Sequence, residues 1–137
     1  MKRCVLDTSI LVKWFSQEKG SEEADRLLEA LEKKKIEIFL PGLVKYELGN
    51  ALLKGKELTF SQAKTALRIF YELPLIFMEE NLELAKLTYK LAEKFNLTYY
   101  DACFLALAKS QKLTLITANP KHQQKIQGVK ILQKIIF

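Results

Sequence analysis

Cysteine and histidine are scarce in this sequence. Its 137 residues include two cysteines, Cys4 and Cys103, which do not form a C-x-x-C pair, and a single histidine. A structural zinc site or a disulfide framework needs several such residues at characteristic spacings. The composition therefore argues against both kinds of site.

Long apolar runs are also missing. A membrane-spanning helix needs about 20 consecutive apolar residues, and no run in the sequence approaches that length. Asp7 interrupts the apolar stretch that follows Arg3, so no secretory signal is recognised at the start of the chain. We therefore expect a cytoplasmic protein, with a single domain over residues 1–137.

The sequence does have an excess of positive charge. Lys and Arg number 22 against 16 Asp and Glu, which gives a formal net charge of +6. Such an excess favours a polyanionic partner such as nucleic acid. For any single lysine an ordinary place on the solvated surface is the better explanation, and this applies to the lysines nearest the candidate site, Lys13, Lys45, Lys54 and Lys121.

Segments typical of strands and of helices alternate along the chain. Short apolar runs predict five strands, over residues 3–6, 36–40, 75–78, 113–117 and 129–132. Helical periodicity and capping residues predict five helices, beginning near Ser21, Val44, Thr59, Asn81 and Thr98. Because parallel strands need crossover connections, we expect a three-layer α/β/α domain with a mostly parallel, twisted sheet of about five short strands.

Three acids stand out from this pattern. Glu47 shares a helical stripe with Val44 and Leu48, Asp101 leads an apolar stripe in a later helix, and Asp7 ends the first strand. Each has an ordinary explanation when taken alone. Glu47 would reach solvent from the boundary of the core, whereas Asp7 and Asp101 would cap helices.

Taken together, the three acids indicate a metal site. In open α/β sheets the carboxyl ends of strands and the adjoining helix starts meet at one crevice. Carboxylates gathered there repel one another unless a cation joins them, and Mg²⁺ or Mn²⁺ prefers oxygen ligands. Such a site suits hydrolysis of a phosphodiester by metal-activated water. A phosphatase with an aspartyl nucleophile fits less well, because it needs Asp-x-Asp and Ser9 occupies the second acidic position.

Four short blocks, in order, resemble the motifs of PIN-domain nucleases, and most closely those of the VapC-like toxin branch. The blocks are VLDTS at 5–9 with LVKWF at 11–15, VKYEL at 44–48, YDA at 100–102 and LITA at 115–118. The resemblance implies a PIN-like fold and a Mg²⁺- or Mn²⁺-dependent endoribonuclease. It also implies the toxin of a type II toxin–antitoxin pair, a homodimer, and a small cognate antitoxin that covers the acidic pocket.

The resemblance assigns roles to individual residues. Asp7, Glu47 and Asp101 are then the catalytic residues and the metal ligands. It also implies a supporting role in the site for four further polar residues, Thr8, Ser9, Thr117 and Asn119.

Asn119 is a departure from the family pattern, which has a fourth acid at this position. An asparagine keeps a carbonyl oxygen but no charge, so we expect a weak or absent second metal ion and modest activity. The alternative is a PIN-like module without turnover that binds RNA or a protein. We expect His122 to be a surface residue, and Trp14 and Phe15 to be packing residues without a functional role.

Overall fold

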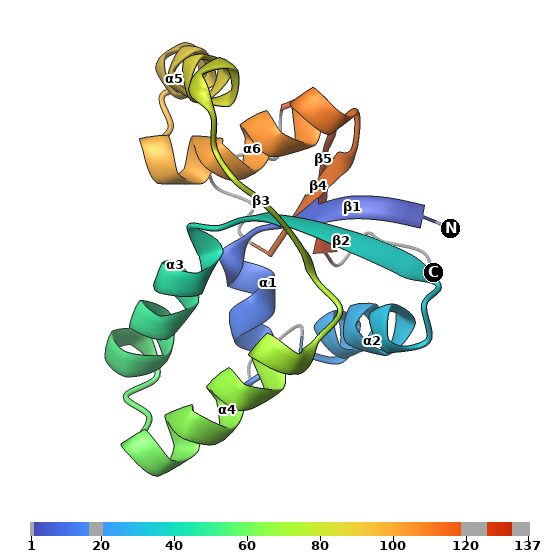
Figure 1. Ribbon diagram of the computed structural model, residues 1–137, viewed down its shortest axis with the longest axis vertical. Coiled ribbons are helices and arrows are strands. Elements are labelled where there is room, and N and C mark those ends of the chain that lie inside the picture. The colour runs from blue at the N-terminus through green and yellow to red at the C-terminus, as the bar shows by residue number, and fades with distance from the viewer. Residues whose placement is uncertain (1, 17–20, 119–125, 133–137) are drawn as a thin grey trace.

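A computed structural model describes the chain apart from residues 1, 17–20, 119–125 and 133–137 (Figure 1). The described strands form one five-stranded sheet. They are Lys2–Leu6 (β1), Ile36–Pro41 (β2), Ile76–Met78 (β3), Thr114–Thr117 (β4) and Val129–Ile131 (β5). The strand order is β3-β2-β1-β4-β5, and every pairing between these strands is parallel. The prediction of a mostly parallel sheet of about five short strands is thus confirmed.

Helices cover both faces of the sheet. They are Thr8–Lys13 (α1), Ser21–Glu32 (α2), Val44–Asn50 (α3), Phe60–Glu72 (α4), Leu82–Phe95 (α5) and Tyr99–Gln111 (α6). Figure 1 shows α1 to α4 on one side of the sheet and α5 and α6 on the other, which confirms the three-layer α/β/α architecture. α6 packs on β1, β2 and β4 and is covered by α5. Its residues 104–108 are therefore all buried, as expected for a helix enclosed on two sides.

The helix starts follow the capping residues in the sequence. Thr59 and Gln62 form a complete capping box at α4, with both side chains bonded to backbone N–H groups. The Asn81 side chain accepts from the Leu84 N–H at 2.9 Å, and the Thr98 hydroxyl accepts from the Asp101 N–H at 3.0 Å. These three predicted helix starts are confirmed.

One predicted helix differs in its second half. The sequence predicts one regular helix from Val44 to Gly55, but a π-helical turn, Ala51–Gly55 (η1), follows α3. The Lys56 N–H donates to the Ala51 carbonyl at 2.9 Å, five residues back. Periodicity cannot reveal this wider turn, because Leu48 and Leu52 are buried and keep the spacing of an ordinary helix.

The core is built from the sheet and the inner faces of its helices. β1 and β2 bury most of their side chains, as strands covered on both faces must. The longest helix in the described ranges has 14 residues, and none of those helices combines the length and apolar character needed to cross a membrane.

Candidate active site

The connections between successive strands lie on opposite faces of the sheet on the two sides of β1. The segment between β1 and β2 runs through α1 and α2 on one face, whereas the segment between β3 and β4 runs through α5 and α6 on the other. β2 and β4 flank β1 on opposite sides, so a crevice is expected at the carboxyl ends of β1 and β4. Asp7 directly follows β1 at this crevice, and Thr117 is the last residue of β4.

Asp7 is held by hydrogen bonds from both sides of the crevice. It is the N-cap of α1, where its side chain accepts from the Ser9 N–H at 3.1 Å and from the Ser9 hydroxyl. The Ser9 oxygen in turn accepts from the Ala118 N–H at 3.1 Å. Ser9 therefore fixes the Asp7 carboxylate relative to the residue that follows β4. The helix cap predicted for Asp7 is present together with these additional contacts.

The surroundings of Asp7 disfavour its charge. Burial raises the pKa of the Asp7 carboxyl to about 6, and the negative charge of Asp101 acts in the same direction. Hydrogen bonds from the hydroxyls of Ser9 and Thr117 oppose the increase in pKa. Thr117 is only 1% exposed, so its hydrogen bond to Asp7 is shielded from solvent.

Glu47 is joined to the same crevice through Thr8. The Thr8 hydroxyl donates to Glu47 Oε1 at 2.7 Å, which links the first residue of α1 to α3. Burial raises the pKa of the half-buried Glu47, the bond from Thr8 opposes that change, and the charge of Asp101 adds to it. Asp101, in the first turn of α6, thus acts electrostatically on both other acids.

The donor chemistry of this crevice fits a hard divalent cation. Its carboxylate and hydroxyl oxygens are the ligand types that Mg²⁺ and Mn²⁺ prefer. Among the described residues no group of three or more His, Cys, Asp or Glu side chains is arranged to hold a metal ion. Repulsion between neighbouring carboxylates opposes such an arrangement until a cation offsets it.

The other residues singled out in the sequence agree only in part with their expected surroundings. Lys13 is only 9% exposed, so its expected place as an ordinary surface lysine is wrong. Lys45 is half-buried, with Nζ 4.3 Å from the centre of the Phe77 ring. Trp14 donates from Nε1 to the Ala24 carbonyl at 2.7 Å and so joins α1 to α2, which agrees with a packing role. The predictions for Asn119, Lys121 and His122 lie outside the described residues.

A cavity of about 300 Å³ is lined in part by Tyr100, the residue that directly precedes Asp101 in α6. It lies at the carboxyl ends of β2 and β3, and its lining includes Leu43, Glu80, Leu84, Tyr99, Tyr100 and Cys103. Burial and the charges of Glu80 and Glu47 raise the pKa of the Cys103 thiol to about 11. No pattern in the sequence indicates this cavity, because its walls come from three separate segments of the chain.

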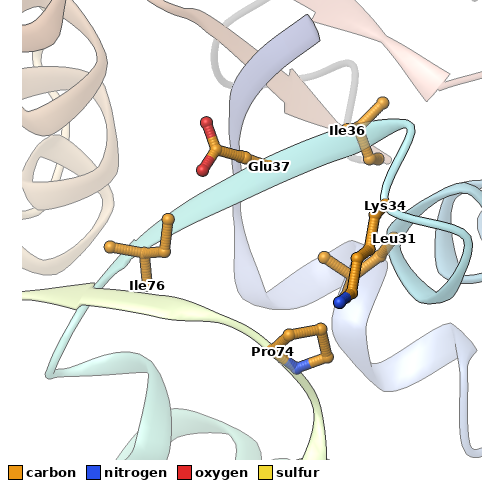
Figure 2. Close-up of a pocket in the computed structure, with 6 residues that line it drawn as sticks. All are labelled: Leu31, Lys34, Ile36, Glu37, Pro74 and Ile76. Atoms are coloured by element: carbon orange, nitrogen blue, oxygen red, sulfur yellow. The ribbon is translucent and has the colours of Figure 1, made fainter. Parts of the chain in front are cut away.

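A second cavity, of about 180 Å³, lies at the other end of β2. Figure 2 shows its lining, formed by Leu31, Lys34, Ile36, Glu37, Pro74 and Ile76. Ile36 is the first residue of β2, whereas Asp7 follows the carboxyl end of the neighbouring strand. This cavity is therefore separate from the acidic crevice.

Comparisons with known proteins identify the family. The family model described as PIN domain matches residues 4–128. A toxin–antitoxin complex from Klebsiella pneumoniae contains a chain that is 25% identical, with coverage of 96% of this chain and 99% of that chain and a TM-score of 0.68. No curated protein matches the sequence.

Two more distant structures share the fold. FitAcB from Neisseria gonorrhoeae is 16% identical, with a TM-score of 0.73 and coverage of 96% of this chain and 99% of that chain. VapC20 from Mycobacterium tuberculosis, a Sarcin-Ricin loop cleaving toxin, is 13% identical, with a TM-score of 0.68 and coverage of 87% and 92%. The resemblance read from the four motif blocks is confirmed, and the chain belongs to the PIN-domain family.

Proposed function

We propose that this protein is a metal-dependent endoribonuclease that hydrolyses RNA phosphodiester bonds and acts as the toxin of a type II toxin–antitoxin pair. The observation that supports it most strongly is the PIN-domain match over residues 4–128, and the negative charge of Asp101 acts on both Asp7 and Glu47. These acids come from three distant segments, and the carboxyl end of β1, where Asp7 lies, is the usual ligand position in an open parallel sheet.

Asp7, Glu47 and Asp101 would together hold Mg²⁺ or Mn²⁺. When bound, the ion would supply a water activated for attack on the phosphodiester and would polarise the phosphate. Thr8 orients Glu47 through its 2.7 Å hydrogen bond, and Ser9 holds the Asp7 carboxylate toward β4.

Two residues at and just after the end of β4, Thr117 and Asn119, complete the proposed site. Thr117 stabilises the ionised form of Asp7 by a hydrogen bond. Asn119, at the position of a fourth acid, would offer only a neutral oxygen, so a second metal ion would bind weakly or not at all.

Charge and similarity support RNA as substrate. The net charge of +6 favours a polyanion, and RNA bound to this chain would release counterions from its phosphates. The structurally similar VapC20 is a toxin that cleaves the Sarcin-Ricin loop.

The similar toxin–antitoxin complexes support a partner as well as a substrate. The chain from the Klebsiella pneumoniae complex is similar to this one over nearly its whole length. We propose that a small cognate antitoxin silences this chain, that residues 1–137 act as one domain, and that the toxin is a cytoplasmic homodimer.

The test is cleavage of a mixed single-stranded RNA pool. We expect cutting with Mn²⁺ that stops with EDTA. Loss of an outer-shell partner of a metal ligand typically costs 10–100-fold, so removal of a ligand itself in Asp7→Asn should cost at least about 100-fold. Asp25→Asn, an exposed acid on α2, is the matched control and should leave cleavage unchanged. Cutting that persists in EDTA or in Asp7→Asn would contradict the proposal.

Asn119 favours a second candidate, a PIN-fold module that binds RNA or protein without turnover. The substitution Asn119→Asp separates the two candidates. A nuclease weakened by the missing acid should cut faster in this variant, because the added carboxylate strengthens metal binding. A binding module should stay inert toward RNA in both forms.

A further inference from the structure

We propose that the cavity beside Glu47 binds one unpaired nucleobase of the RNA next to the cleaved bond, and that it favours a base with an exocyclic amino group. We call it the base cavity, and its lining includes Leu43, Glu79, Glu80, Leu84, Tyr99 and Tyr100. The proposal rests on the proposed nuclease function and names a part of its substrate.

The base cavity and the acidic crevice share structural elements. Pro41 and Met78 are paired at the ends of β2 and β3, so the cavity opens on the same sheet edge as Asp7. The turn that supplies Leu43 also begins α3, where the Glu47 N–H donates to the Leu43 carbonyl at 3.1 Å. Tyr100 directly precedes Asp101 in α6. An RNA strand whose phosphate lies at the acids would thus have a neighbouring nucleotide at this cavity.

Aromatic rings and an apolar floor suit a nucleobase. Tyr100 is 59% exposed and Tyr99 is 36% exposed, so part of each side chain is accessible from solvent. Bases stack on such rings largely regardless of sequence, and a single ring commonly contributes about tenfold or more to affinity. The volume of about 300 Å³ lies at the lower end of the range for small-molecule sites.

Charge distinguishes a base from a phosphate as the occupant. Glu79 and Glu80 both line the cavity, and two carboxylates there repel a phosphate. Glu80 Oε1 accepts from the Tyr99 hydroxyl at 3.1 Å, which fixes the position of this carboxylate. Its other lone pairs can accept from an amino group, as carboxylates do from cytosine N4. Uracil has a carbonyl oxygen in place of that amino group and would be disfavoured.

Binding in EDTA tests the base cavity without relying on cleavage. Labelled C6 and U6 RNA hexamers would be titrated with the full-length protein and followed by fluorescence anisotropy. We expect C6 to bind at least about fivefold more tightly than U6, because cytosine offers an N4 amino donor to the carboxylate where uracil has the O4 acceptor. Glu80→Gln should abolish or invert that preference, and Tyr100→Ala should weaken both hexamers about tenfold.

Matched controls come from exposed residues of α5. Glu93→Gln and Tyr89→Ala change the same residue types away from the cavity lining and should bind both hexamers like the wild type. Equal binding of C6 and U6, or control variants that behave like the cavity variants, would overturn the proposal. So would a Tyr100→Ala variant that changes the oligomeric state while RNA affinity stays constant, because the cavity would then be a protein interface.

The two proposals fail in different ways. Discrimination of C6 from U6 that depends on Glu80, without any cleavage in Mn²⁺, would contradict the nuclease and support the base cavity. Metal-dependent cleavage without that discrimination would contradict the base cavity alone.

Discussion

Asp7 is subject to two opposed requirements. In its proposed role as a metal ligand Asp7 must be ionised, yet its buried position and the nearby Asp101 raise the pKa of this carboxyl to about 6. In the absence of a cation the ionised side chain therefore destabilises the folded state at neutral pH. Strained or destabilised groups of this kind are typical of functional sites.

The first prediction concerns Asp7→Asn in metal-free buffer. The folded-state pKa of about 6 exceeds the ordinary value of 3.8, so the folded chain binds the proton more tightly than the unfolded chain does. The contribution of Asp7 to stability is thus most favourable below about pH 4 and declines as pH rises to about 6. Asparagine carries no charge and remains a good N-cap. The variant should gain about 1–3 kcal/mol of unfolding free energy at pH 7.5.

Urea unfolding in EDTA at pH 4 and at pH 7.5 measures this effect. At pH 4 wild type and variant should be nearly equal in stability, because Asp7 is largely protonated in the folded wild type. A variant that is less stable than the wild type by the same amount at both pH values would show that Asp7 acts only through its hydrogen bonds.

At the scale of single residues, the sequence singled out acids that do not fit the surrounding pattern. Glu47 in an apolar stripe was such a signal, and the structure gives it a hydrogen bond from Thr8. The expected place of Lys13 at the surface was wrong, because no periodic pattern marks α1 as a helix with a buried inner side. The roles of the acids themselves stay predictions.

Among the helices, α6 carries residues of both proposed sites. Its first turn holds Asp101 of the acidic crevice and Tyr100 of the base cavity, and Thr98 caps that turn. The N–H group that donates the capping hydrogen bond to the Thr98 hydroxyl, at 3.0 Å, is that of Asp101 itself. Thr98 therefore caps the turn that carries both side chains.

The second prediction compares two helix caps. Thr98→Ala and Thr59→Ala each remove an N-cap hydroxyl and should each lower the unfolding free energy by about 1 kcal/mol. Only Thr98→Ala should reduce RNA cleavage, by about tenfold, because it loosens the turn that carries Asp101. Thermal unfolding measures the loss of stability that the two variants share. Initial cleavage rates, taken under conditions where both variants are folded, measure the loss of activity expected for Thr98→Ala alone. Equal cleavage rates in the two variants would contradict the positioning role of Thr98.

Helices and strands were the most predictable elements because their signals are local. Capping residues such as Asn81 act within a few residues of the sequence, and the helix starts agree with them. The third strand begins at Ile76 rather than at residue 75, within the usual uncertainty of an element boundary. The π-helical turn after α3 was not predictable, since it preserves the apolar spacing.

For the whole molecule, the arrangement of strands decides which residues meet. The order β3-β2-β1-β4-β5 places β4 beside β1 although more than 100 residues separate them, and this brings Thr117 to Asp7. Sequence alone predicts the alternation of strands and helices but not which strands are neighbours. The base cavity depends on the adjacency of β2 and β3 in the same way, and for that reason it had no signature in the sequence.

The central claim is that Asp7, Glu47 and Asp101, from three separate segments, bind one divalent ion. Isothermal titration of the full-length protein with Mn²⁺ tests it most directly, with Asp7→Asn and the exposed control Asp25→Asn alongside. We predict binding to the wild type and to Asp25→Asn, and a loss of at least about 100-fold in affinity for Asp7→Asn. No measurable binding to the wild type, or equal affinity in all three proteins, would contradict the claim.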